Sequence, residues 1–271
     1  MKPPLFLIHG YWSTPATFAR LKSRFEALGH EVHAPALPYH DRDPSLAPAA
    51  EIGTLTVEDY ARFLVAEIVK LAAPPVIIGH SMGGMLAQIV AARVPHAGLV
   101  LLSTAATAAT LVPSLATVRT MGGVMIRWGW WRSPTQISPE AAMWGIYNNV
   151  PDAIARAEYA AHVWDSGRVL AEMTLPGVSA TGATKVDYRR LDRPALVIVG
   201  TEDRITVPGI SRATARKLAG TVDYHEIAGS GHWLFWGAFE MRVGDYIADW
   251  LGQFDTSIPA EAGTHESTSP A

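Results

Sequence analysis

The chain has 271 residues, of which 49% are hydrophobic and 17% charged, and its formal net charge at pH 7 is −3. This length suits one large domain or two small ones, and the composition allows a sizeable buried core. The small negative charge argues against a nucleic-acid-binding surface, and the absence of cysteine excludes disulfides, thiolate nucleophiles and cysteine-ligated metals.

Apolar runs and helical patterns alternate along the first hundred residues. Short runs such as LFLI and VII are apolar on both sides, which is typical of strands in a parallel sheet covered by helices. Thr14-Pro15 predicts a helix start, and Thr56 with Asp59 resembles a capping box. The predicted strands are 5–8, 31–38, 74–79 and 97–104, and the predicted helices are 14–28, 56–71 and 82–94.

The second half resumes this alternation after an interruption. From 104 to 190 short helical pieces alternate with Pro and Gly, which predicts a helical cap inserted into the sheet domain. The predicted fold is α/β, with a mostly parallel sheet of about six strands and helices on both faces. The later predicted elements are strands 193–203 and 222–229, the latter at an edge, and helices 211–218 and 243–251. The predicted core is 1–103 with 191–252, and 253–271 is a predicted disordered tail.

A Gly-His-Ser-Met-Gly-Gly segment begins at Gly79, where the third predicted strand becomes a helix. A serine raised on such a sharp turn needs neighbours without side chains, and Gly79 and Gly83 meet this need. The turn would place Ser81 at a helix N-terminus, where free N–H groups favour negative charge. We therefore predict that Ser81 is a nucleophile rather than only a helix cap, with an oxyanion hole formed by the N–H groups of Tyr11 and Met82.

A nucleophilic serine needs a base and a carboxylate. His232 follows the last predicted strand in the glycine-flanked turn AGSGHWLF, and it is the predicted base because His225 falls within that strand. Glu202 and Asp203 end the buried run VIVGTED, and we predict that Asp203 orients the imidazole. The alternatives are a histidine that caps the final helix and an aspartate that pairs with Arg204.

These motifs together resemble those of α/β-hydrolase fold serine hydrolases, in the branch with a helical cap that includes monoacylglycerol-lipase-like esterases. FLIHGY resembles the oxyanion loop, GHSMGG the nucleophile elbow, VGTEDRITVP the acid loop and GSGHW the histidine loop. The resemblance covers residues 2–251 and implies Ser81, Asp203 and His232 as a catalytic triad. Since the chain begins at the family's third strand, we expect the first two strands of the fold to be absent.

The predicted cap carries five tryptophans that would line an apolar pocket over Ser81, although most of them could simply pack the cap on the core. Its charges form no one-sided cluster, which favours a neutral ester with a medium acyl or aromatic group. The predicted pocket residues are Trp12, Met125, Trp128, Trp144, Trp164 and Trp233.

The predicted activity is carboxylic-ester hydrolysis through an acyl-enzyme, on a small-molecule substrate and with no cofactor or metal. The same side chains could instead serve a lactone, thioester, amide or carbon–carbon bond or perhydrolysis, and a non-catalytic small-molecule receptor is a further alternative. No signal peptide or membrane span is predicted. We therefore expect a cytoplasmic protein with no nucleic-acid partner and no stable membrane insertion, and we leave a homodimer open.

Overall fold

The computed structural model describes residues 2–175 and 182–255, and a six-stranded sheet forms its centre. All neighbouring strands pair in parallel, in the order β2-β1-β3-β4-β7-β8. Their bounds are β1 Leu5–Ile8, β2 Val32–His33, β3 Val76–His80, β4 Gly98–Leu102, β7 Ala195–Gly200 and β8 Val222–Ile227. The predicted fold class is confirmed, and β8 lies at an edge as predicted.

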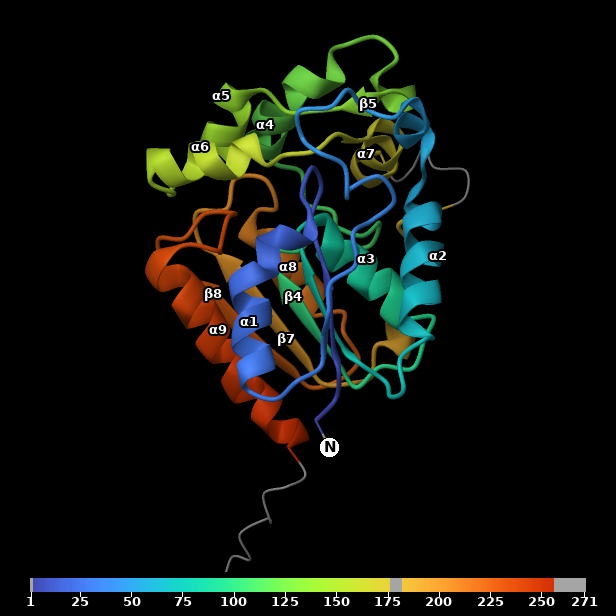
Figure 1. Ribbon diagram of the computed structural model, residues 1–271, viewed down its shortest axis with the longest axis vertical. Coiled ribbons are helices and arrows are strands. Elements are labelled where there is room, and N and C mark those ends of the chain that lie inside the picture. Colours follow the sequence, from blue (N-terminus) through green and yellow to red (C-terminus); the bar gives the residue numbers. More distant parts are fainter. Residues whose placement is uncertain (1, 176–181, 256–271) are drawn as a thin grey trace, which may run out of the picture.

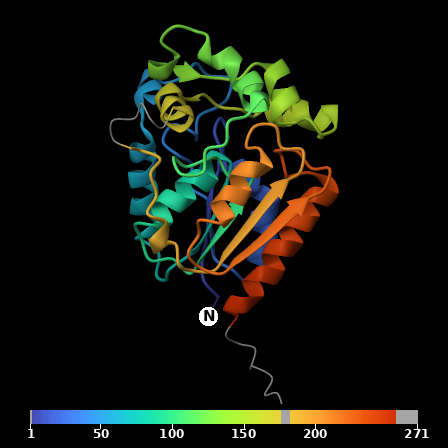
Figure 2. The ribbon, with the colours of Figure 1, turned by 180° about the vertical axis from the view of Figure 1, so that it is seen from behind.

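Helices cover both faces of the sheet. α1 (Ala19–Ala27) and α9 (Gly237–Leu251) lie in front of it in Figure 1. Figure 2 views the molecule from behind and shows α3 (Met82–Ala91) and α8 (Pro208–Ala215) on the opposite face. α2 (Val57–Ile68) packs beside α3. A sheet enclosed in this way needs strands that are apolar on both sides, as the sequence of β1 and β7 is.

The side chains of β1 alternate between two cores. Leu5 and Leu7 belong to the core that contains Phe25 of α1, whereas Phe6 and Ile8 belong to the core beneath α2 and α3. Each of these side chains is almost fully buried, and burying one contributes about 1.5–3 kcal/mol. The strand is therefore firmly anchored just before the loop that approaches Ser81.

Local capping signals fix several helix starts. The Thr56 side chain accepts the N–H of Asp59 at 3.1 Å, and the Asp59 carboxylate accepts the N–H of Thr56 at 2.9 Å, which confirms the predicted capping box. The Thr14 hydroxyl likewise accepts the N–H of Ala16 at 3.3 Å. Short 3-10 helices are η1 Pro15–Phe18, η2 Ala50–Thr54, η3 Trp130–Arg132 and η4 Tyr188–Arg190.

Several predicted boundaries were wrong, among them the start of α9, which begins at Gly237 rather than at 243. α8 begins at Pro208 rather than at Ser211, because the fixed φ of proline suits the first helical position. β2 ends before Pro35, which has no N–H to donate to a neighbouring strand. The predicted tail from 253 overlaps the 3-10 helix η5 (Gly252–Phe254), whose last ring packs on Trp250 with centroids 5.1 Å apart. The rest of the predicted tail, from 256, lies outside the described residues.

Between β4 and β7 the chain builds a layer over the carboxyl ends of the strands (Figure 1). Its helices are α4 Leu115–Met125, α5 Pro139–Gly145, α6 Asp152–Ala160 and α7 Gly167–Thr174. The sequence predicted no strand here, but β5 (Pro134–Thr135) pairs antiparallel with β6 (Asp165–Ser166). We call this pair the cap ribbon. The exact limits of the cap, 104 and 190, stay a prediction.

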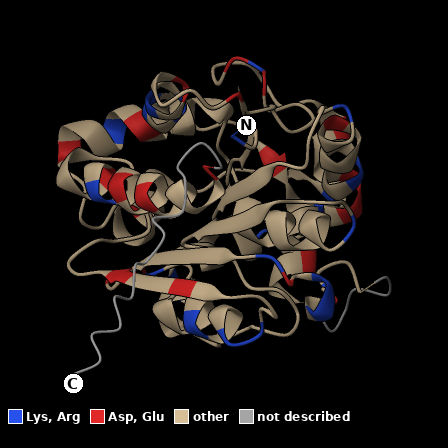
Figure 3. Ribbon diagram, turned by 90° about the horizontal axis from the view of Figure 1, so that it is seen from below, with Lys and Arg blue, Asp and Glu red and all other residues tan. Residues whose placement is uncertain are grey.

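Charges are confined mainly to the periphery. In Figure 3, which views the molecule from the end opposite the cap, the inner strands are tan and segments of both signs lie around them. None of the helices within residues 2–175 and 182–255 combines the length and the apolar character needed to cross a bilayer.

Candidate active site

Ser81 stands at the turn between β3 and α3 with φ 56° and ψ −122°, which L residues rarely adopt. A Cβ on Gly79 would lie 2.2 Å from the carbonyl oxygen of Gly83, and a Cβ on Gly83 would lie 2.0 Å from that of Ile8. Strand and helix therefore approach too closely for any side chain at either position. This is the close approach that the sequence predicted at these two glycines.

Four hydrogen bonds hold the strained backbone of Ser81. Its N–H donates to the carbonyl of Leu102 at 3.0 Å, and its own carbonyl accepts from the N–H groups of Gly84 at 2.9 Å, Met85 at 3.3 Å and Ala105 at 2.8 Å. The surrounding β4 and α3 thus fix a conformation that would cost free energy in isolation. The side chain is about nine-tenths buried.

Asp203 and His232 meet beside the carboxyl ends of β7 and β8. His232 Nδ1 donates to Asp203 Oδ2 at 2.9 Å, and both side chains are buried. The other carboxylate oxygen accepts the N–H groups of Ile205 at 3.0 Å and Thr206 at 2.8 Å. Burial raises the pKa of Asp203, but the His232 ring and the Thr206 bonds outweigh it, so that the pKa is lowered overall.

Thr206 was not singled out from sequence. Its hydroxyl lies 2.8 Å from Asp203 Oδ2 and 3.1 Å from His232 Nδ1, so that it adds a third polar group to the pair. Its position three residues after the acid is the pattern of a side chain that closes a turn on a carboxylate. That pattern is present in the segment DRIT and could have identified it.

Ser81 and His232 line the same cavity, which has a volume of about 380 Å³. With Nδ1 bonded to Asp203, the remaining ring nitrogen of His232 is Nε2. Among the described residues, the Ser81 hydroxyl makes no hydrogen bond with that ring. A hydrogen bond of this kind is often loose before substrate binds.

The N–H groups of Tyr11 and Met82 are available for a ligand. Met82 is the first residue of α3, and neither N–H donates to another residue in the part of the chain that the structure describes. The loop after β1 approaches the serine closely, since a Cβ on Gly10 would lie 3.1 Å from the Cβ of Ser81. The residues predicted for an oxyanion hole therefore border the site.

The cavity wall is apolar except for hydroxyl groups and histidines, and no Asp, Glu, Lys or Arg lines it within the described ranges. Trp12, Met125 and Trp233 line it, as the sequence predicted. Lining residues that the prediction did not include come from α5, α7, α8 and the loops beside them: Ile146, His162, Leu170, Met173, Ile205 and Ile210.

Three predicted pocket residues lie elsewhere. The side chain of Trp128 is 93% exposed, because it lies beyond the end of α4. Trp144 lies between two guanidinium groups, with Arg119 at 4.1 Å and Arg204 at 4.9 Å from its ring centre. Trp164 borders a separate small hollow under the loop 39–49. None of these three side chains lines the cavity that contains Ser81.

His80 braces the histidine loop. Its Nε2 lies 3.2 Å from the carbonyl oxygen of His232, and the two rings have centroids 4.9 Å apart. Burial, with the neighbouring His232 ring, lowers the pKa of His80 to about 3, so that it is a neutral donor.

Comparisons with known proteins agree with this architecture. The sequence model of the alpha/beta hydrolase family matches residues 5–241. A pimeloyl-[acyl-carrier protein] methyl ester esterase of Xanthomonas oryzae pv. oryzae is 28% identical over 95% of this chain and 96% of its own. The monoacylglycerol lipase of Paleococcus ferrophilus has a similar structure, with a TM-score of 0.66 and 23% identity over 94% of this chain and 97% of its own. A methylesterase from Arabidopsis gives a TM-score of 0.69 at 13% identity, over 93% and 99% of the two chains.

Proposed function

We propose, since the chain belongs to the alpha/beta hydrolase family, that it hydrolyses carboxylic esters through an acyl-enzyme formed on Ser81. The observation that carries this proposal is the 2.9 Å contact of a buried Asp203 with His232, in the wall of the cavity that Ser81 lines. A buried serine with a strained backbone, an oriented imidazole and a carboxylate is the arrangement that activates a hydroxyl.

The proposed reaction proceeds in two halves. His232 Nε2 takes the proton from Ser81 as its Oγ attacks the ester carbonyl carbon, and the N–H groups of Tyr11 and Met82 stabilise the oxyanion. His232 then gives the proton to the leaving alcohol. Water, activated by the same ring, attacks the acyl-enzyme, and the carboxylic acid leaves as Ser81 regains its proton. Asp203 stabilises the imidazolium in both halves.

The proposed substrate is a neutral ester with an apolar acyl or aromatic group. A cavity of about 380 Å³ falls in the range of small-molecule sites. Its uncharged wall offers an ionised substrate no counter-charge. The Xanthomonas relative is named for a methyl ester, and this likeness supports an ester as the scissile group.

We also propose that residues 104–190 form the cap of this site. Met121 and Met125 of α4 and Leu170 of α7 line the cavity together with Ser81. Acyl chain preference would then depend mainly on cap residues, whereas bond chemistry would depend on residues at the strand ends.

The test compares wild type, Ser81→Ala and Ser13→Ala on p-nitrophenyl esters of increasing acyl length, and on a lactone and a thioester. Ser81→Ala should lower kcat by about 10³-fold or more with the fold retained. Ser13 also lines the cavity, but its hydroxyl bonds to Thr17, so Ser13→Ala should keep kcat within about twofold of wild type.

Labelling with a fluorophosphonate identifies the nucleophile, because the adduct should map to Ser81 by mass spectrometry. Ester turnover that survives in Ser81→Ala would contradict the proposal. Labelling of Ser81 without turnover of any ester, lactone or thioester would favour a receptor instead.

A further inference from the structure

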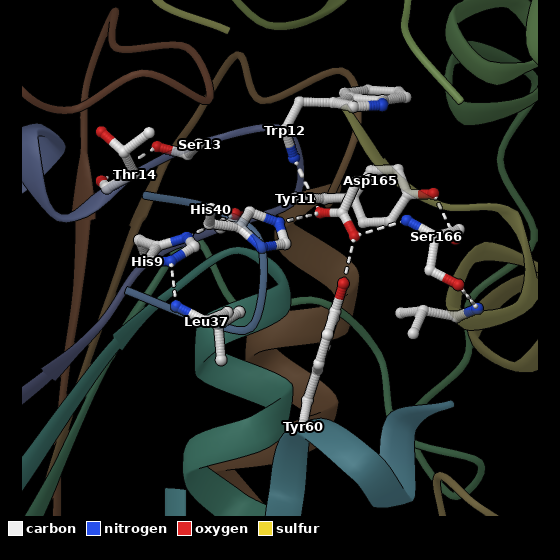
Figure 4. A network of polar contacts seen from close by, with 12 residues as sticks. His9, Tyr11, Trp12, Ser13, Thr14, Leu37, His40, Tyr60, Asp165 and Ser166 are labelled. Carbon is white, nitrogen blue, oxygen red and sulfur yellow. Dashed lines mark hydrogen bonds and ion pairs between the residues drawn. The ribbon is translucent and has the colours of Figure 1, made fainter. Parts of the chain in front are cut away.

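A buried carboxylate on the cap ribbon has no role in the reaction described above. Asp165 is fully buried in β6 (Figure 4). Its Oδ1 accepts the hydroxyl of Tyr60 at 2.8 Å and the N–H of Ser166 at 2.7 Å, and its Oδ2 accepts the N–H of Trp12 at 3.0 Å. Burying a carboxylate is costly unless hydrogen-bond donors satisfy its oxygens. A charged group placed here, with several donors arranged around it, therefore needs an explanation.

The bond to Trp12 reaches the oxyanion loop. Trp12 follows Tyr11, whose N–H is a proposed oxyanion donor, and its φ of 60° is unfavourable for a residue with a side chain. Such a conformation persists only where its surroundings fix it. The Tyr11 N–H belongs to the Gly10–Tyr11 peptide, one unit before the peptide that carries the Trp12 N–H. The two planes are joined at the Cα of Tyr11, so anchoring the Trp12 N–H restrains the backbone of Tyr11 and, through it, the direction of the oxyanion donor.

The cap ribbon, and Val163 just before it, hold the same loop at further points. The Tyr11 hydroxyl donates to the carbonyl of Ser166 at 2.6 Å and lies 2.7 Å from the Thr135 hydroxyl. The Trp12 indole donates to the carbonyl of Thr135 at 3.0 Å, and the Trp12 carbonyl accepts the N–H of Val163 at 2.9 Å. Asp165 is the charged member of this set, and charge-assisted bonds are the stronger ones.

Two groups from the sheet domain hold Asp165 in turn. Tyr60 comes from α2, and His40 lies with Nε2 3.0 Å from Asp165 Oδ2 and Nδ1 3.0 Å from the carbonyl oxygen of Pro38. The contact does not have the geometry of a well-formed hydrogen bond, and it is an ion pair when the His40 ring is protonated. Burial lowers the pKa of His40, but Asp165 together with the backbone carbonyls of Pro38 and Leu37 outweighs it, so that the pKa is raised overall and the charged ring is favoured.

We propose that Asp165 is a positioning residue for the oxyanion hole: by accepting the N–H of Trp12, it aims the N–H of Tyr11 at the substrate carbonyl oxygen. This inference rests on the proposed function, since it concerns the same site. The competing explanation is that Asp165 only joins the cap to the sheet domain. In that case its loss would lower stability and leave transition-state stabilisation unchanged.

The decisive variant is Asp165→Asn, which keeps the size of the side chain but removes its charge and turns one acceptor into a donor. Removing an oxyanion donor outright costs about 10²–10³-fold in kcat, so misaligning one should cost about 10–100-fold. KM should stay within about threefold, because the N–H of Tyr11 bonds to the substrate oxygen mainly in the transition state. The affinity for an aliphatic trifluoromethyl ketone, which forms a tetrahedral adduct with serine, should fall by about the same factor as kcat/KM.

A matched control is Glu172→Gln. Glu172 is also a buried cap carboxylate, and it accepts the N–H of Val57 at 2.9 Å and pairs with Arg168 at 3.0 Å, away from the oxyanion loop. Its variant should lose stability, yet kcat and ketone affinity should stay within about twofold of wild type.

If Asp165→Asn folds poorly, a milder variant can be measured in its place. Tyr60→Phe removes one bond to Asp165 and leaves the charge, and it should lower kcat by about threefold or more with KM unchanged. Suppose that wild type hydrolyses esters and that Asp165→Asn folds, or that Tyr60→Phe replaces it. If that variant keeps kcat and ketone affinity at the level of Glu172→Gln, the inference is overturned. A wild type without ester turnover would instead overturn the proposed function.

Discussion

The closest backbone approach at the turn of Ser81 gives the sharpest prediction, which is the effect of Gly83→Ala. The new Cβ would lie 2.0 Å from the carbonyl oxygen of Ile8 and 2.6 Å from that of His9. Contacts to Cβ below about 3.0 Å do not occur in folded proteins, so α3 must move away from β1 by about 1 Å. Both atoms in conflict are backbone, and neither can rotate aside.

That shift acts on stability and on turnover together. Overpacking of this kind costs about 1–3 kcal/mol in the free energy of unfolding. Ser81 precedes α3 directly and moves with it relative to His232, and a misplacement of about 1 Å costs about 10²-fold in rate. We therefore expect kcat/KM for p-nitrophenyl butyrate to fall by about 10²-fold and unfolding to begin at a lower urea concentration.

Gly122→Ala provides the control. A Cβ on Gly122, in α4, would meet nothing within 4 Å. Alanine is favoured over glycine inside a helix by about 1 kcal/mol, so this variant should be equally or more stable and should keep kcat/KM within about twofold. If Gly83→Ala matched this control in both kcat/KM and stability to urea, the argument that backbone contact requires glycine at this turn would be refuted.

Three other perturbations address the acid, the buried histidine and the cavity wall. Asp203→Asn should lower kcat by about 10³-fold or more, because an amide does not stabilise a charged His232 ring, and steady-state kinetics showing full activity would contradict this. Burial lowers the pKa of His162 to about 4, so the unfolded chain binds a proton at this ring below about pH 6.5 and the folded protein does not. Between about pH 7.5 and 5.5, the free energy of unfolding of His162→Phe should therefore rise by about 1 kcal/mol relative to that of wild type, as measured by urea titration. A difference between the two proteins that stays constant with pH would argue against this. Met125→Ala should raise KM for an octanoate ester several-fold, whereas Trp128→Ala, with its ring 93% exposed, should leave KM within about twofold; equal effects of the two would mean that the cavity assignment is wrong.

The residues at the strand ends could be predicted because their signals are local. A serine between two glycines, at the junction of an apolar run and a helix, defines its own backbone turn, and the structure places Ser81 in that turn. Asp203 follows the buried strand β7 and His232 follows the edge strand β8, and the carboxyl ends of parallel strands meet at one edge of the sheet. Their contact at 2.9 Å follows from topology rather than from any pairing visible in the sequence.

The cavity wall could not be predicted in the same way. Met125 and Trp128 are three residues apart and both apolar, but Met125 ends α4 facing the cavity, whereas Trp128 lies past the helix end. Which side of a cap helix faces inward depends on how the cap docks, and that docking is a tertiary property. Asp165 is a stronger example, because its proposed role depends on a hydrogen bond with Trp12, which lies 153 residues earlier in the chain.

Both edge strands of the sheet are poorly suited to pair with a strand of another molecule. On one side β2 has only two residues, Val32–His33, and presents too few backbone groups to template another strand. On the other side β8 carries Asp223 and Glu226, and Arg212 clamps Glu226 with bonds of 2.6 and 2.9 Å. An incoming strand would have to displace or bury these charges, so the sheet resists extension by a second copy of the chain.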